Sequence, residues 1–302
     1  MRQKIGVFFG LVVAVGAAGC LGRPIQPTPV PVRTLQPTPT TVPVQRTSAG
    51  LPLVDVTARD SSYDMPDTIP AGWVSFTMHN EASSQRNAQL FRLNDGVTFD
   101  QAAAAFSTGQ APEQLVTFAG GLGTVPPGGQ QTIVEQLSAG QYVMVSLIHD
   151  WFLVFHVPPG LVKVFRVVAP PGPQAADALP ATHEDGVVHM LDFRYTLPDI
   201  TPGEHNYKLV NEGQQPHEIL VRRINPDKTL ADIQAYIRDP GGQPPPYDEA
   251  GSGGALVDEP GSTEWMSLDL PVGDYVGICF VVEPNSGKSH AELGMLTEFN
   301  VK

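Results

Sequence analysis

The stretch that decides the fold runs from Tyr195 to Ile224 and reads YTLPDITPGEHNYKLVNEGQQPHEILVRRI. A second stretch from Tyr63 to Leu93, YDMPDTIPAGWVSFTMHNEASSQRNAQLFRL, follows the same plan. Each begins with Tyr-x-x-Pro-Asp, followed by a turn at Pro or Gly and a segment in which apolar and polar residues alternate. Asn-Glu then leads into a second apolar segment. Alternation with a period of two indicates a half-buried strand. The two stretches therefore predict two copies of one β-rich unit.

The likeness continues on both sides of these stretches. Thr98 precedes FDQAAAAF and Thr229 precedes LADIQAYI, so each copy should have a short helix with Thr as its N-cap. Each copy then reaches Gly-x-Tyr-Val, at Gly140 and at Gly273, and closes with a last apolar strand. The pattern predicts an all-β chain of two tandem Greek-key β-sandwiches, each with a short helix. We expect a first repeat over residues 51–170, a linker over 171–182 and a second repeat over 183–302.

The N-terminus has the features of an export signal. Arg2 and Lys4 precede an apolar stretch over residues 5–18 that is short for a membrane span. The following Gly19-Cys20 resembles the lipobox of bacterial lipoproteins, in which the cysteine is lipidated. We therefore expect a signal peptide over residues 1–20, lipid on Cys20, and an extracytoplasmic protein anchored to the cell membrane. The alternative is an ordinary secretory peptide that is cut nearby.

Residues 21–50 are rich in Pro and Thr and show no apolar periodicity, so a disordered linker is expected there. The whole chain has 302 residues, enough for two domains of ordinary size, with 30 Gly and 30 Pro that favour short strands and many turns. Its formal net charge of −13 argues against nucleic acid as a partner and favours basic partners.

A candidate metal site lies mainly in the segment GDYVGICFVVEPNSGKSHAELGM, from Gly273 to Met295. Cys279, His290 and Met295 come from this segment, and His217 comes from the stretch between Tyr195 and Ile224. One thiolate, two imidazoles and one thioether form a set that selects a single copper ion. The chain has two cysteines, and with Cys20 assigned to lipid, Cys279 has no disulfide partner. The alternative for Cys279 is a small buried apolar residue.

With these residues in place, the second repeat resembles the cupredoxins, the blue-copper family that includes plastocyanin, azurin and auracyanin. The resemblance rests on Asn-x(5)-His in NEGQQPH, on GDYVGICF, and on His-x(4)-Met in HAELGM. It implies one type 1 copper bound equatorially by His217, Cys279 and His290 and axially by Met295. One departure is the length of residues 280–289 between Cys279 and His290, which is greater than in plastocyanin.

The first repeat departs from this ligand set. Arg86 stands where His217 stands, Ser146 matches Cys279, and Leu161 matches Met295, while His156 alone matches His290. A serine is no thiolate and an arginine repels a cation, so we expect no blue copper in this repeat. Its expected role is structural, either packing against the copper domain or presenting a surface to a partner.

Four other features are open to two interpretations. Three histidines of the first repeat could form a separate metal site, but unpaired histidines are more often surface or core residues; they are His79, His149 and His156. Trp151 and Phe152 could be a docking patch or could pack under their own loop. The Gly- and Pro-rich loop over residues 239–262 could cover the site or contact a partner, although a flexible insertion is expected. Met190 and Met266 could be extra thioethers, but their alternating context favours the core.

The leading functional hypothesis is an extracytoplasmic, membrane-anchored blue-copper protein that passes single electrons to a redox partner such as a cytochrome or another copper protein. The alternatives are copper capture and delivery, or a cell-surface binding module without metal. No enzyme is expected, because Ile278-Cys279-Phe280 lacks the His-Cys-His run that connects blue copper to a trinuclear centre in copper oxidases. Paired His-x-His motifs, and the second cysteine of a dinuclear centre, are also missing from the sequence.

Overall fold

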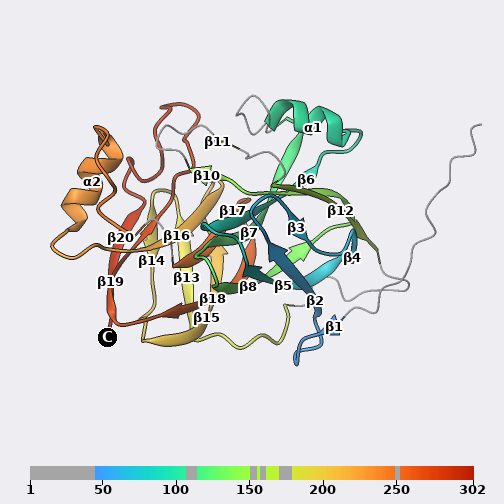
Figure 1. Ribbon diagram of the computed structural model, residues 1–302, viewed down its shortest axis with the longest axis horizontal. Helices are drawn as coiled ribbons and strands as arrows, with labels where there is room; N and C mark the ends of the chain where they lie inside the picture. Colours follow the sequence, from blue (N-terminus) through green and yellow to red (C-terminus); the bar gives the residue numbers. More distant parts are fainter. Residues whose placement is uncertain (1–44, 107–113, 150–154, 157–160, 170–178, 249–251) are drawn as a thin grey trace, which may run out of the picture. The chain divides into compact units, whose positions relative to one another are not determined.

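Two large β-sheets account for most of the structure, a computed structural model that describes residues 45–106, 114–149, 155–156, 161–169, 179–248 and 252–302 (Figure 1). The first sheet has the order β1-β2-β5-β8-β18-β15-β13-β14, with β3 pairing off β2. Its strands are β1 (Gln45–Arg46), β2 (Pro52–Ala58), β3 (Tyr63–Asp64), β5 (Gly72–Asn80), β8 (Gln130–Leu137), β13 (Gly186–Leu191), β14 (Arg194–Thr196), β15 (Gly203–Asn211) and β18 (Thr263–Leu270).

The second sheet has the order β20-β19-β16-β17-β7-β6-β9-β12-β4. A separate short pair, β10 (Ile148–His149) and β11 (Phe155–His156), lies outside both large sheets. The strands of the second sheet are β4 (Thr68–Pro70), β6 (Arg86–Leu93), β7 (Val116–Val125), β9 (Gly140–Val145), β12 (Val162–Val168), β16 (His217–Arg223), β17 (Gly253–Asp258), β19 (Gly273–Ile278) and β20 (Leu296–Val301).

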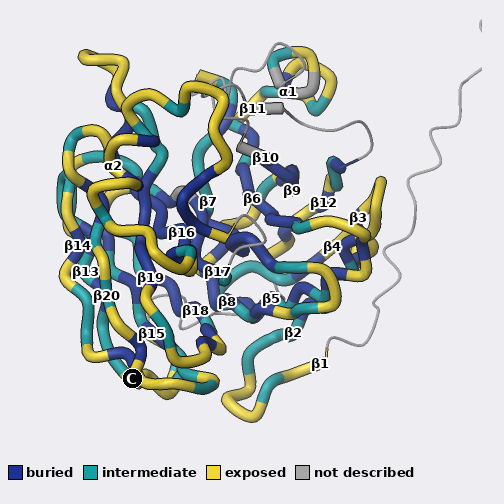
Figure 2. The backbone as a smooth tube through the Cα atoms, turned by 60° about the vertical axis from the view of Figure 1, so that its left-hand side comes forward, coloured by how far each residue is buried: buried dark blue, intermediate teal, exposed yellow. Residues whose placement is uncertain are grey.

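The core lies between the two sheets. It combines residues of the first sheet, such as Phe76 and Leu209, with residues of the second sheet, such as Leu90 and Val221. In Figure 2 the buried residues lie mainly along the strands, and many of the exposed residues lie in the connections. Alternating strands bury one face each, and two such faces packed together exclude water from both. The predicted all-β sandwich is thereby confirmed.

The two repeats are joined strand to strand. In the first sheet, Trp265 of β18 pairs with Val134 of β8, and in the second sheet Ala255 of β17 pairs with Leu122 of β7. Each sheet therefore runs through both repeats without a break. The edge-to-face contact of Trp73 and Trp265, with ring centroids 5.3 Å apart, adds an apolar contact across this seam.

Strand β17 corrects the expectation of a flexible insertion over residues 239–262. Part of this segment is a strand that pairs with β16 of its own repeat and with β7 of the other repeat. Gly254 makes this possible, because a Cβ there would lie 2.1 Å from the carbonyl oxygen of Ile219. The abundance of Gly and Pro indicated a loop, whereas glycine in this strand allows its backbone to approach the neighbouring strand closely.

Both predicted helices are present, α1 (Phe99–Phe106) and α2 (Leu230–Arg238). Thr229 caps α2 in a capping box with Asp232, and Thr98 exchanges equivalent hydrogen bonds with Gln101 before α1. α2 packs Ile233 on Val276 and Ile278, which face away from the central core. Met190 and Met266 are core residues, as their alternating context predicted.

Several predictions concern residues that the structure does not describe. The signal peptide over residues 1–20, Cys20, and nearly all of the linker over 21–50 lie outside the described residues, as do Trp151, Phe152 and most of the linker over 171–182. The side chains of His149 and His156 are also not described. Within the described residues, no helix is long and apolar enough to span a membrane.

Candidate metal centre

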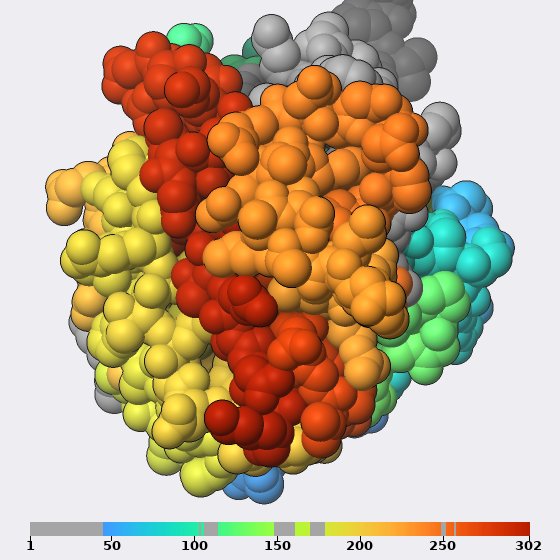
Figure 3. Space-filling view, turned by 90° about the vertical axis from the view of Figure 1, so that its left-hand side faces the viewer, coloured from blue at the N-terminus to red at the C-terminus, as the bar shows by residue number. Residues whose placement is uncertain are grey.

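Three segments of the second repeat supply the candidate ligands. His217 is the first residue of β16, Cys279 follows the last residue of β19, and His290 lies in the segment that connects β19 to β20. β16 and β19 are neighbours, with Leu220 opposite Ile278, so the start of one strand lies beside the end of the other. Figure 3 shows the C-terminal segment in red between the yellow strands that open the repeat and the orange α2 region.

Strand alternation directs the thiol inward. Tyr275 and Cys279 belong to the central core between the sheets, whereas Val276 and Ile278 face the opposite side beneath α2. Side chains two residues apart share a face of a strand, so Cys279 continues the inward set of β19. The thiol therefore points between the sheets.

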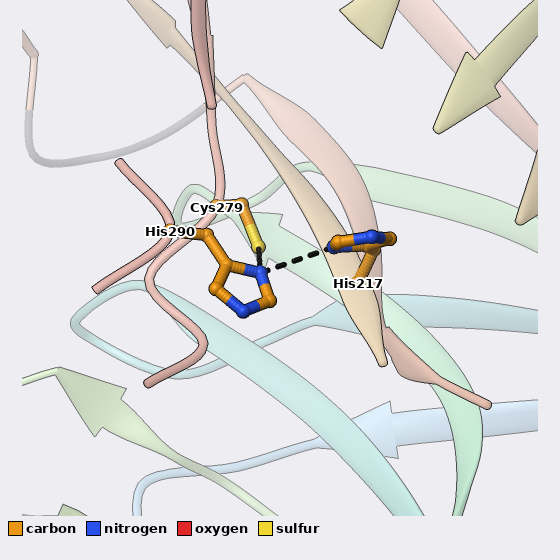
Figure 4. Close-up of side chains that lie close together, drawn as sticks. All are labelled: His217, Cys279 and His290. Carbon is orange, nitrogen blue, oxygen red and sulfur yellow. Dashed lines mark hydrogen bonds between the residues drawn. The ribbon is translucent and has the colours of Figure 1, made fainter. Parts of the chain in front are cut away.

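The structure brings His217, Cys279 and His290 together, with their potential ligand atoms all within 4.8 Å of one another (Figure 4). The Nδ1 atoms of the two histidines are 3.1 Å apart, and Cys279 Sγ lies 3.5 Å from His290 Nδ1. In the described part of the chain this is the one group of three or more such side chains close enough to share an ion.

The outer nitrogen of each histidine has its own partner. His217 Nε2 lies 3.1 Å from Asp192 Oδ1, and His290 Nε2 lies 3.0 Å from Gln215 Oε1. Both partners are acceptors, so each Nε2 carries the proton and each Nδ1 keeps a lone pair. Burial lowers the pKa of His217, and burial together with His217 lowers the pKa of His290 to about 4. Both rings are therefore neutral at pH 7.

Two lone pairs that face each other across 3.1 Å repel unless a cation lies between them. Neutral imidazole nitrogens with a thiol sulfur beside them are the donors that copper and zinc prefer, whereas Mg²⁺ and Ca²⁺ prefer oxygen ligands. The donors present therefore fit the copper ion expected from the sequence.

The thiol is held in apolar surroundings beside an acidic group. Burial and the nearby Glu218 carboxyl raise the pKa of Cys279 well above its ordinary value. Glu218 Oε1 accepts a hydrogen bond of 2.9 Å from the backbone N–H of Phe280, which ties β16 to the residue after the cysteine. Burial also raises the pKa of Glu218, to about 7. The hydroxyl of Tyr195 donates to the backbone oxygen of Glu218 and completes this support.

Met295 is fully buried in the same core as Cys279. Its backbone N–H donates to the carbonyl of His290 at 2.8 Å, and its carbonyl accepts from Cys279 N at 3.2 Å. The backbone thus binds Met295 to two of the clustered residues. Its role as an axial ligand stays a prediction from the family resemblance.

The long segment between Cys279 and His290 forms an ordered hairpin. Val282 pairs with Ser289, and the Glu283 carboxylate accepts hydrogen bonds from the backbone N–H groups of Asn285 and Ser286 at 3.0 and 2.7 Å. These bonds lower the pKa of Glu283 to about 2. The extra length is folded back on itself, and His290 N donates to the carbonyl of Val281 at 2.7 Å.

The first repeat keeps the framework of this site with different residues at the ligand positions. Arg86 begins β6 as His217 begins β16, and both are buried. Its guanidinium donates to the carbonyls of Arg59, Asp60 and Gln85 at 3.2, 3.0 and 2.8 Å. Ser146 is fully buried at the cysteine position.

The hydrogen bonds around Ser146 are equivalent to those around Cys279 in the second repeat. The hydroxyl of Tyr63 donates to the backbone oxygen of Asn87, as Tyr195 does to Glu218. Asn87 Oδ1 accepts from the backbone N–H of Leu147 at 2.8 Å, as Glu218 does from Phe280. His79, part of the alternative metal site, instead lies 4.0 Å from Asp55 and is partly exposed.

Sequence reasoning missed the residues that hold the ligands in place: Asp192, Gln215, Glu218 and Tyr195. One signal for Asp192 and Tyr195 was present in the repeats. Asp60 lies three positions before Tyr63, and Asp192 lies three positions before Tyr195. The matching pairs indicate a shared structural role in the two repeats.

No family model matches the sequence, and no curated protein matches it. Solved structures similar to the chain include reduced auracyanin from Roseiflexus castenholzii, at 19% identity over 38% of this chain and 96% of that one, with a TM-score of 0.25. Auracyanin A from Chloroflexus aurantiacus matches at 15% identity over 39% of this chain and 100% of that one, with a TM-score of 0.27. A multicopper oxidase matches at 15% identity over 86% of this chain and 92% of its own, with a TM-score of 0.26.

The fold and the site together define an all-β sandwich protein with a buried His-Cys-His cluster in its second repeat.

Proposed function

We propose that the chain is a cupredoxin-like blue-copper protein that binds one copper ion in the second repeat and transfers single electrons. The observation that carries the proposal is the close approach of the two Nδ1 atoms, 3.1 Å apart, beside the Cys279 sulfur. His217, Cys279 and His290 would hold the ion equatorially, with Met295 as the axial ligand. Copper in such a site supplies a reversible one-electron couple.

Burial of the ligands favours electron transfer over catalysis. His217, Cys279, His290 and Met295 each have 0% of their surface exposed, so a small substrate has no direct approach to them. Asp192 and Gln215 fix both imidazoles from behind, so the rings need not turn when the charge of the site changes. A rigid, closed site suits the passage of electrons, and we infer that the protein is a carrier and not an enzyme.

The same features support a carrier over copper capture and delivery. A protein that passes on its ion needs ligands that a partner can reach, and these ligands are covered. Copper delivery is the alternative function that the second experiment below tests.

We further propose that the carrier is lipid-anchored through Cys20 on the extracytoplasmic side of the cell membrane. The N-terminal sequence supports this, with its basic start, short apolar stretch and Gly19-Cys20. With a net charge of −13, the protein would attract a redox partner that presents a basic surface, such as a cytochrome or another copper protein.

The first experiment uses the full chain with Cys20→Ser, which prevents lipidation, and the same chain with Cys279→Ser added. Copper-loaded protein should show an intense thiolate-to-copper absorption band and a narrow copper hyperfine splitting in its spin resonance spectrum. Both should disappear in the Cys279→Ser variant while the circular dichroism stays unchanged. A band that survives in that variant would refute the site.

A second experiment separates electron transfer from delivery. The self-exchange rate of the loaded protein should be fast, and an excess of a copper chelator should remove the ion slowly. Slow self-exchange together with rapid loss of copper to the chelator would favour delivery instead.

A further inference from the structure

Asp192 lies behind the candidate ligand His217, with Oδ1 3.1 Å from the outer ring nitrogen Nε2. The imidazole is fully buried, whereas the Asp192 side chain is 32% exposed. We propose that Asp192 is a positioning residue that sets the orientation of His217 and favours Cu(II) over Cu(I), which lowers the reduction potential. This inference rests on the proposed copper-binding function.

The loop before His217 is built around this carboxylate. The backbone N–H of Gln214 donates to Asp192 Oδ1 at 2.9 Å, so one oxygen serves both the loop and the ring. Gly213 leaves the necessary space, because a Cβ there would lie 2.5 Å from both Asp192 Oδ1 and His217 Nε2. The carboxylate therefore occupies a defined place and does not swing freely in solvent.

The two histidines receive different support. His290 Nε2 meets the neutral amide of Gln215, while His217 Nε2 meets a carboxylate. A carboxylate that accepts the proton of an imidazole makes the opposite nitrogen a stronger donor and adds negative charge near the ion. Both effects are larger for the more highly charged oxidation state. The charge at Asp192 should therefore stabilise Cu(II) more than Cu(I).

The first repeat offers independent support. Asp60, the counterpart of Asp192, accepts hydrogen bonds from the backbone N–H and hydroxyl of Ser83 at 2.8 and 2.7 Å. Its Oδ1 also lies 3.7 Å from the guanidinium of Arg86. In the repeat that has no thiolate, the same carboxylate thus faces a positive charge that the chain itself supplies. The first repeat thus shows that a carboxylate at this position can face a positive charge.

The test compares Asp192→Asn, which removes the charge and keeps an acceptor, with Asp192→Glu, which keeps the charge. Glu212→Gln is the matched control, since it removes one charge from the loop before His217 at a residue that pairs with His189 instead. The full chain with Cys20→Ser is loaded with copper. Its midpoint potential is measured by spectroelectrochemical titration, and Cu(II) and Cu(I) affinities by competition with chelators.

For Asp192→Asn we expect Cu(II) affinity to fall 10- to 100-fold, in line with the loss of such a partner, while Cu(I) affinity stays nearly constant. Each tenfold difference between the two oxidation states raises the midpoint potential by about 59 mV for one electron. Asp192→Glu should lie nearer the unchanged protein, and Glu212→Gln should show no such shift.

Three outcomes would overturn the inference while leaving the copper site intact: an unchanged potential in Asp192→Asn, an equal loss of affinity for both oxidation states, or the same shift in Glu212→Gln. The failure of the proposed function looks different, because the unchanged protein would then lack the thiolate band from the start.

Discussion

Arg86 and His217 occupy equivalent positions in the two repeats, each as the buried first residue of a strand in the second sheet. The carboxylates Asp60 and Asp192 face them in the same way, 3.7 Å from the guanidinium and 3.1 Å from the imidazole. A side-chain cation in one repeat thus stands where the other repeat has a candidate ligand for a metal cation. In the first repeat, the hydrogen bonds of the Arg86 guanidinium therefore connect the surrounding segments without an ion.

Removal of this guanidinium should destabilise the protein. Arg86→Met leaves the carbonyls of Arg59, Asp60 and Gln85 without the donor that they now share, and we expect a loss of about 1–3 kcal/mol in the free energy of unfolding. Urea denaturation of the copper-free protein measures it. An unchanged midpoint would show that the guanidinium is not needed to hold this end of the sandwich.

The framework around Arg86 should also accept a metal once the ligand types are restored. The double variant Arg86→His with Ser146→Cys should raise the copper content from about one to about two ions per chain and add a second thiolate band, because His156 stands at the remaining position. Each single variant should stay at one ion. Metal analysis and absorbance check both, and a double variant with one ion would show that the first repeat cannot host the ion.

Met295→Leu tests the axial position. The replacement is close in volume at a fully buried site, so it should cost less than about 1.5 kcal/mol and keep the copper. The midpoint potential should rise, since the thioether that weakly stabilises Cu(II) is lost. Potentiometric titration measures the change, and an unaltered potential and spectrum would remove Met295 from the ligand set.

Gly213→Ala tests the space beside Asp192 and His217. The added methyl group would lie 2.5 Å from Asp192 Oδ1 and from His217 Nε2, so the carboxylate, the ring or both must shift. We expect weaker Cu(II) binding and a changed copper spectrum, with a similar direction to Asp192→Asn. Glu212→Gln is again the control, because it changes the residue next to Gly213, and Glu212 pairs with His189 instead of a candidate ligand.

The seam between the repeats should make stability depend on pH. Glu135 of β8 and Glu264 of β18 are buried next to the paired residues Val134 and Trp265. Burial and their mutual proximity raise the pKa of Glu135 well above its ordinary value, and burial raises the pKa of Glu264 to about 8 and that of Asp258 to about 6. The folded state therefore binds protons more tightly than the unfolded state.

The contribution of these three carboxyl groups to the free energy of unfolding should therefore be greatest below about pH 4.5 and should decrease as the pH rises toward 8. The slope is at most about 1.4 kcal/mol per pH unit for each group that titrates. Urea midpoints from pH 5 to 9 measure it. Glu264→Gln should flatten the curve, whereas the surface variant Glu212→Gln should leave it unchanged; a flat curve for the unchanged protein would contradict the prediction.

Much of the fold was contained in local sequence patterns. The repeated Tyr-x-x-Pro-Asp stretches predicted two β-rich copies, and Thr98 and Thr229 marked both helix starts. These features depend on residues that are close in sequence, so period and capping chemistry determine them. Residue types likewise predicted that His217, Cys279 and His290 belong to one site, and the structure brings their side chains together.

The tertiary structure decided what depends on contacts between distant segments. The pairing of β17 with β7, which makes each sheet continuous across both repeats, joins residues more than a hundred positions apart through backbone groups that carry no sequence signature. The support of His217 by Asp192 depends on a loop and a strand end meeting in space. Local preference selects the elements and the ligand types, whereas close packing of remote segments decides how the sheets join and which charges face the site.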